Sequence, residues 1–89
     1  MKIEVKKLSE DEIAKMGIKK WPVWTKEISI FDWFYDSQEM CLFLEGKVVV
    51  KTDSGDVEMQ KGDFVIFPKG LKCVWHVLEP VRKHYHFDN

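Results

Sequence analysis

The chain has 89 residues, which is enough for one domain and too few for two. Its 14 basic and 15 acidic residues leave a formal net charge of -1, and neither sign forms a block that could follow a phosphate backbone or an anionic membrane. We therefore predict a single domain over residues 1–89, with neither nucleic acid nor a membrane as a partner.

The N-terminal segment predicts one strand and one short helix. Residues 1–15 mix charged and apolar side chains without a long apolar run, so we expect no secretory signal, no spanning segment and a cytoplasmic protein. Residues 2–7 alternate apolar and polar side chains, which predicts a strand with one solvent-facing side. Ser9 and Glu12 have the spacing of a capping box, and Gly17 suits the end of the helix that would follow.

From Trp21 onward, strand-like runs recur at short intervals and no helical period is sustained. The predicted strands are residues 22–28, 30–36, 39–45, 47–52, 56–60, 63–67, 71–79 and 81–87. Tight hairpins are expected at Glu45-Gly46, Asp53-Ser54-Gly55, Lys61-Gly62-Asp63 and Pro68-Lys69-Gly70. Many short strands with such turns predict a sandwich or a barrel, because closure removes exposed sheet edges.

Cys41 and Cys73 are the only two cysteines of the chain. They are too few for the disulfide framework of a secreted miniprotein and are not spaced as a CxxC pair. We predict that both are free thiols.

Two segments resemble the sequence motifs of the cupin superfamily. Residues 39–46 match the second half of the first motif, a Glu followed after six residues by Gly, and residues 62–70 match the start of the second, a Gly, five residues and then Pro-x-Gly. A wider likeness is to the small single-domain cupins related to the cupin domain of (S)-ureidoglycine aminohydrolase. It rests on Trp21-Pro22, Phe31-x-Trp33-x-Tyr35, Glu39, Leu44-Glu45-Gly46, Gly62-Asp63, Phe67-Pro68-Lys69-Gly70, Cys73-x-Trp75-x-Val77 and Lys83-His84-Tyr85.

This resemblance implies an all-β fold: a cupin-type, jelly-roll-like antiparallel β-barrel with one short N-terminal helix. It also implies a substrate class, a small nitrogen-containing metabolite such as ureidoglycine. Most small cupins of this kind have no assigned activity, so the resemblance predicts the fold more specifically than it predicts the reaction.

The resemblance also shows which metal ligands are missing. Metal-binding cupins have a His-x-His pair before the motif Glu and a third His after Pro-x-Gly, whereas this chain has Asp-Trp-Phe-Tyr-Asp at residues 32–36 and Cys73. A divalent metal needs three or four converging ligands, and only Glu39 and Cys73 remain. We therefore expect no metal and no other cofactor. His84 and His86 share one strand face and are an alternative pair, but the alternation of their neighbours predicts that this face points outward.

The cupin register would turn Glu39 into the barrel, and strand alternation would then place Cys41 on the same inner face. Lys83 alternates with apolar residues of the last strand, so we expect an inward ammonium that pairs with Glu39 or Tyr35. The result is an aromatic cup for a small-molecule ligand. The catalytic candidates are Glu39, Tyr35 and Lys83, and the ligand-binding candidates are Trp33, Cys41, Cys73, Trp75 and Tyr85.

Each candidate also has an ordinary structural explanation. Glu39 is either a general base or hydrogen-bond anchor, or a solvated carboxylate at the start of a strand. Cys73 would be a nucleophile if Lys83 lowered its pKa, but a buried free cysteine usually only packs. Trp33 and Trp75 either line a pocket or fill the core.

Three functions are compatible with the sequence. The first is an enzyme or degenerate enzyme that acts on a nitrogen-containing metabolite, and the second is a metal-free module that binds a small ligand. The third is a filled barrel that serves only for packing or as a symmetric homodimer. An open, polar-lined cup favours the first two, and a plug of Trp33, Trp75 and Phe43 favours the third.

Overall fold

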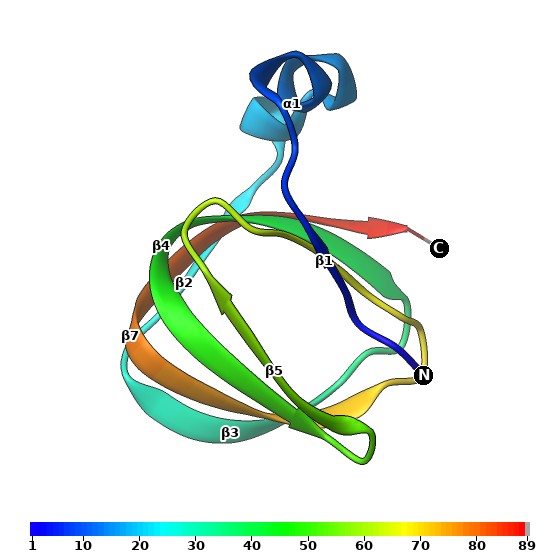
Figure 1. Ribbon diagram of the computed structural model, residues 1–89, viewed down its shortest axis with the longest axis vertical. Helices are drawn as coiled ribbons and strands as arrows, with labels where there is room; N and C mark the ends of the chain where they lie inside the picture. The colour runs from blue at the N-terminus through cyan, green and yellow to red at the C-terminus, as the bar shows by residue number, and fades with distance from the viewer. Residues whose placement is uncertain (89) are drawn as a thin grey trace.

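Two long strands, β4 (Gln38–Thr52) and β7 (Lys72–Asp88), form the centre of the fold in a computed structural model that describes residues 1–88. Shorter strands join them in one seven-stranded antiparallel sheet, which bends round into a barrel (Figure 1). The predicted fold, an all-β antiparallel barrel with one short N-terminal helix, is confirmed. The other elements are β1 (Glu4–Lys6), α1 (Glu10–Met16), the 3-10 helix η1 (Ile18–Lys20), β2 (Val23–Lys26), β3 (Ser29–Phe34), β5 (Gly55–Gln60) and β6 (Phe64–Phe67).

The helical segment lies at one end of the barrel (Figure 1) and begins and ends as the sequence predicts. The Ser9 side chain accepts a hydrogen bond from the backbone N–H of Glu12, and the Glu12 carboxylate accepts one from the backbone N–H of Ser9. Gly17 ends α1 at φ 67°. Ile13 and Ile18 then pack on the outer side of the sheet, against Leu42 and Phe64. None of the helices in residues 1–88 is long and apolar enough to cross a membrane.

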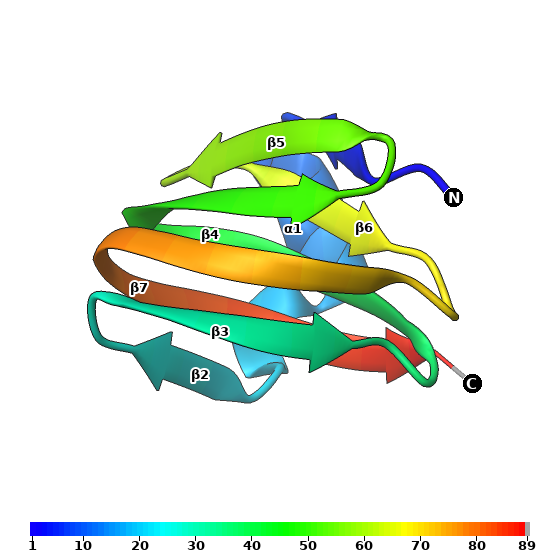
Figure 2. The same ribbon diagram turned by 90° about the horizontal axis from the view of Figure 1, so that it is seen from below.

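The strand order is β1-β6-β4-β7-β2, with β3 also paired to β7 and β5 to β4. Figure 2 shows β5, β4, β7 and β3 side by side in that sequence. Of the four predicted hairpins, the turn at residues 53–55 joins the paired strands β4 and β5. The hairpins predicted at residues 61–63 and 68–70 are wrong. The chain turns there, but β6 pairs with β1 and β4, and β7 pairs with β2, β3 and β4.

The hairpin predicted at Glu45-Gly46 is also wrong, because β4 runs through this site as one strand. Register shifts between Phe43, Glu45 and Lys47 mark a bulge opposite β7, with Gly46 at φ 97°. A bulge bends its strand and increases the twist of that strand, so one long strand can take part in both halves of a barrel. The two strands predicted at residues 71–79 and 81–87 also form one strand, β7, which runs through Pro80. Pro80 lies next to the bulge at Gly46, where the sheet needs fewer backbone hydrogen bonds and a proline is tolerated.

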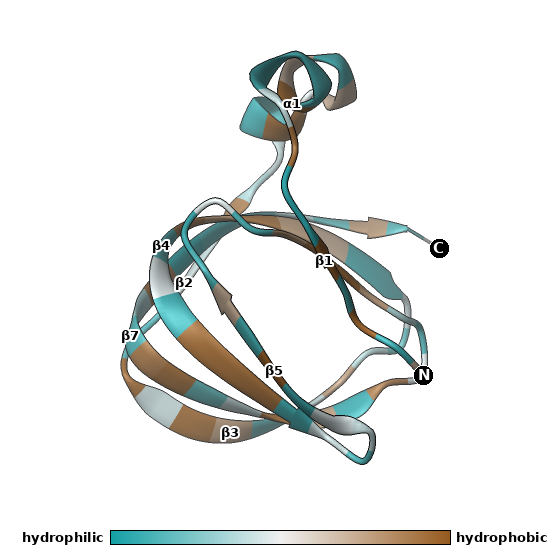
Figure 3. Cartoon of the chain, viewed as in Figure 1, coloured by the Kyte–Doolittle hydropathy of each residue, from teal (hydrophilic) through white to brown (hydrophobic). Residues whose placement is uncertain are grey.

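The core follows from alternation along the two long strands, which Figure 3 shows as alternating hydrophobic and hydrophilic residues. Glu39, Cys41 and Phe43 are 3%, 0% and 1% exposed, so the predicted inner face of β4 is confirmed. Trp75 and Val77 of β7 are each 2% exposed, opposite Val50 and Val48 of β4. The interior is therefore mostly apolar. Glu39 and Lys83 are charged residues within it, and Asp63 is a further buried charged residue, in the turn before β6.

Candidate functional site

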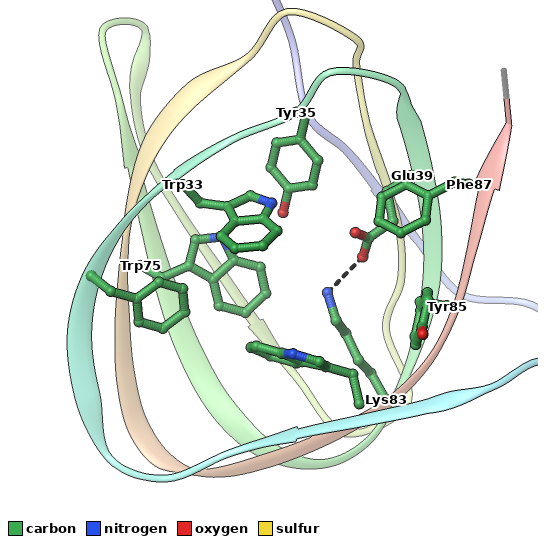
Figure 4. A pocket seen from close by; sticks show the side chains of 9 residues that line it. Trp33, Tyr35, Glu39, Trp75, Lys83, Tyr85 and Phe87 are labelled. Atoms are coloured by element: carbon green, nitrogen blue, oxygen red, sulfur yellow. Dashed lines mark hydrogen bonds and ion pairs between the residues drawn. The ribbon is translucent and has the colours of Figure 1, made fainter.

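A pocket of about 150 Å³ opens between β2, β3, β4 and β7 (Figure 4). Trp33 and Phe87 are 43% and 41% exposed and form its rim, whereas Tyr35 and Trp75 are both 2% exposed and lie deeper. The cup is therefore open, and the predicted plug is incomplete. Its lining residues are Trp24, Phe31, Trp33, Tyr35, Glu39, Trp75, Lys83, Tyr85 and Phe87.

A buried ion pair is the polar centre of this pocket. Lys83 Nζ donates a hydrogen bond of 2.6 Å to Glu39 Oε2, and both side chains are 5% exposed. The register sets Lys83 opposite Phe43 on β4, so its side chain reaches along the strand to Glu39. The predicted inward ammonium paired with Glu39 is confirmed, and the explanation of Glu39 as a solvated carboxylate is wrong.

Four aromatic rings surround the Lys83 ammonium. Its Nζ lies 4.6 Å from the ring centroid of Trp75 and 4.9 Å from that of Trp24. The distances to Phe67 and Phe43 are 5.5 Å and 5.9 Å. A cation over a ring face is attracted by the ring quadrupole, and more strongly when water is excluded. We call these four residues the Lys83 cage. The cage and Glu39 together fix the position of the ammonium.

Tyr35 places a hydroxyl in the same pocket. Its backbone N–H donates to Leu71 O at 2.9 Å, its carbonyl accepts from Gly70 N, and its ring stacks on Phe67 with centroids 4.6 Å apart. Burial, reinforced by the nearby Glu39 carboxylate, raises the pKa of the Tyr35 phenol well above its ordinary value. The phenol therefore stays protonated and can donate a hydrogen bond.

Trp75 carries an indole N–H that is the one buried side-chain polar atom without a hydrogen-bond partner in residues 1–88. It lies near the Tyr35 hydroxyl and the Cys73 thiol, and its donor character lowers the pKa of each against the larger, opposite effect of burial. A buried donor without a hydrogen-bond partner costs free energy, so native proteins contain few such groups.

Neither cysteine lines the pocket, in contrast to the prediction. The Cys41 thiol lies 3.8 Å from Val65 O, and the Cys73 thiol lies 3.7 Å from Trp33 O. Burial raises the pKa of Cys41 to about 12 and that of Cys73 to about 11, and the opposing charge of Lys83 is too weak to reverse this. The structure therefore supports the packing explanation for both cysteines and not a nucleophilic role for Cys73.

We expect both thiols of the folded protein to react slowly with iodoacetamide. A thiol with a pKa of about 11 is roughly one-thousandth ionised at pH 8, and the thiolate is the reacting species. Since the pKa is raised, the rate at Cys73 should increase about tenfold per pH unit up to about pH 11. Peptide mass spectrometry measures each site, with urea-unfolded protein as the control. Fast labelling of Cys73 at pH 8 would contradict the assigned environment.

The histidines near the C-terminus contact the helical segment. His84 Nδ1 lies 2.9 Å from Trp21 O, and the His86 ring stacks on Trp21 with centroids 5.2 Å apart. Among residues 1–88, no group of three or more His, Cys, Asp or Glu side chains is placed to hold a metal ion. The motif carboxylate of Glu39 instead binds the Lys83 ammonium.

Three pocket residues were not among the site residues predicted from the sequence: Trp24, Phe31 and Phe87. The alternation of Phe31 with Trp33 and of Phe87 with Tyr85 already indicates a shared face for each pair. Trp24 carries no such signal. It enters the pocket because β2 pairs with β7 and brings Trp24 opposite Lys83.

The sequence profile of the EutQ-like cupin domain matches residues 13–85. The chain belongs to this cupin family. A solved DUF861 family protein from Thermotoga maritima is 49% identical, with a TM-score of 0.95 over 98% of this chain and 100% of that chain. These two matches show the cupin fold and family.

Two solved EutQ proteins are more distant cupin relatives and support the fold alone. The Clostridium difficile EutQ protein is 20% identical, with a TM-score of 0.68 over 96% of this chain and 66% of that chain. A putative ethanolamine utilization protein Q from Salmonella typhimurium LT2 is 17% identical, with a TM-score of 0.67 over 98% and 69%. No curated protein matches this cupin chain. None of the relatives described here is named for an activity on ureidoglycine, so that substrate class stays a prediction.

Proposed function

We propose that this cupin barrel binds and acts on a small nitrogen-containing metabolite through an amide or ureido group, the group that ureidoglycine carries, without a resident metal. The observation that carries this proposal is the Glu39–Lys83 pair, which is buried at the floor of an open aromatic pocket. A buried ion pair adds little stability compared with well-packed apolar residues. A few convergent polar groups in an apolar concavity are instead typical of a ligand site.

The polar groups match both ends of an amide. The Glu39 carboxylate accepts a hydrogen bond from the amide N–H, and the Lys83 ammonium and the Tyr35 hydroxyl donate to the carbonyl oxygen. The charges of Glu39 and Lys83 cancel, and the Lys83 cage already holds a cation. The pocket therefore prefers a neutral group to a second cation. Its volume of about 150 Å³ limits the bound part of the ligand to roughly the size of benzene, which occupies an engineered apolar cavity of similar volume.

Tryptophan fluorescence tests this proposal, because Trp24, Trp33 and Trp75 line the pocket and are three of the four tryptophans of the chain. We expect a saturable change with acetamide and methylurea and none with tetramethylammonium at the same concentrations. Tyr35→Phe should weaken methylurea binding about three- to tenfold, the value of one hydrogen bond. Tighter binding of tetramethylammonium than of methylurea, or no saturable response to any probe, would refute the proposal.

A filled barrel is a less suitable description, since the pocket is open beside the buried Trp75 and Phe43. The predicted homodimer stays a prediction. Large apolar side chains on the outer side of the β3 region offer a surface for it, with Ile28, Ile30 and Phe34 at 64%, 68% and 58% exposed.

A further inference from the structure

We propose that Lys83 forms a protonated Schiff base with a small aldehyde or ketone that enters the pocket. This inference goes beyond amide binding, and it rests on the proposed function only in requiring that the pocket admit a small organic molecule. It is carried by the position of one amine, Lys83 Nζ, between a carboxylate and four aromatic rings.

The setting favours reaction at Lys83 once Glu39 has taken the proton from its ammonium. Lys83 lines the pocket, yet its side chain is only 5% exposed, so bulk water has little access to the nitrogen. Lysines that form Schiff bases are typically desolvated in apolar pockets. Exclusion of water also protects a reactive imine from hydrolysis.

Glu39 provides the proton transfers that the reaction needs. Its Oε2 is 2.6 Å from Nζ and accepts the proton that the ammonium must lose before it can attack. The neutral amine then forms a bond to the carbonyl carbon, and the π electrons of the C=O bond move to the oxygen. A proton passes from nitrogen to that oxygen to give a carbinolamine, and protonated Glu39 returns its proton to the hydroxyl, which leaves as water while nitrogen forms the double bond.

The starting and final charges are the same in this sequence. An ammonium and a carbonyl become an iminium and water, so neither an oxidant nor a reductant is needed. The iminium keeps its positive charge at Nζ, where Glu39 and the Lys83 cage already stabilise the ammonium. The cage would therefore stabilise the adduct as well as the free lysine.

The Tyr35 hydroxyl is a hydrogen-bond donor of the pocket that fits a carbonyl oxygen. Figure 4 shows the Tyr35 hydroxyl and the Glu39 carboxylate pointing into the same space as the Lys83 ammonium. Donors aimed at an oxygen that gains negative charge stabilise the attack on the carbonyl. The pocket volume of about 150 Å³ restricts the substrate to a small molecule.

Reductive trapping tests the proposal on the unmodified protein. We would treat it with limiting propionaldehyde and sodium cyanoborohydride, and then locate propyl groups by intact mass and peptide mapping. Lys83 should be alkylated about a hundredfold faster than Lys51, whose side chain is 49% exposed, because only Lys83 has a positioned proton acceptor within an apolar site. Alkylation of exposed lysines with Lys83 left unmodified would overturn the proposal.

Variants separate this inference from the proposed function. Lys51→Met should leave the Lys83 adduct unchanged, whereas Tyr35→Phe should slow its formation. Lys83→Met should abolish it, and if that variant does not fold, Glu39→Leu/Lys83→Met takes its place.

Saturable quenching by propionaldehyde without an adduct at Lys83 would refute the Schiff base alone. Failure of every probe to change the tryptophan fluorescence would refute the binding pocket, and with it both proposals.

Discussion

Glu39→Leu and Lys83→Met are each expected to lower the free energy of unfolding by about 3–5 kcal/mol, because each leaves the other charge buried without its partner. The two side chains are both 5% exposed and joined at 2.6 Å, so each charge would lose its ion-pair partner at a position that bulk water scarcely reaches. A loss of this size is a large fraction of the total stability of a small domain. Urea unfolding followed by circular dichroism measures it.

The double variant Glu39→Leu/Lys83→Met should recover most of this loss, to within about 1 kcal/mol of the original protein, since no unpaired charge remains. Lys51→Met is the matched control. Lys51 pairs with Asp56 at 3.5 Å, but the two side chains are 49% and 56% exposed, so its removal should cost less than about 1 kcal/mol. If the single variants at the buried pair cost no more than this control, the pair is not the constrained centre described above.

Gly46→Ala is expected to destabilise the protein by about 3 kcal/mol or more. A Cβ at this position would lie 2.4 Å from Pro80 O and 2.7 Å from Val81 Cα, and both neighbours are backbone atoms that cannot turn aside. The φ of 97° adds strain for any residue with a side chain. The clash should also push β7 away from the bulge, just before Lys83, and so weaken ligand binding to the pocket.

Gly17→Ala is the comparison for this prediction. Gly17 also has a positive φ, of 67°, but nothing lies within 4 Å of its added Cβ. Only the conformational penalty applies there, about 1–2 kcal/mol, and the pocket should be unaffected. Thermal unfolding and methylurea titration of both variants give the two quantities. Equal losses of stability would mean that the contact with Pro80 does not constrain the bulge.

Local interactions explain which features could be predicted from the sequence. The capping box of Ser9 and Glu12 and the left-handed Gly17 depend on residues a few positions apart, and all three are found as predicted. The inner face of β4 follows from the cupin register together with alternation along the strand, and the inward Lys83 follows from alternation with its apolar neighbours. The cupin-type barrel was predicted from the resemblance of residues 39–46 and 62–70 to two motifs of a known family, and the family match over residues 13–85 agrees with it.

The sequence by itself thus determined the barrel, its inner faces and the charged residues inside it. Which strands pair with which was decided by the tertiary structure. A glycine suits a hairpin and a bulge equally, and only the register of β4 against β7 and the close approach of Pro80 identify Gly46 as part of a bulge. Trp24 joined the Lys83 cage through the pairing of β2 with β7. Cys41 and Cys73 lie outside the pocket for the same reason. The position of a cavity and the desolvation of a thiol depend on contacts between residues far apart in the chain, which spacing does not encode.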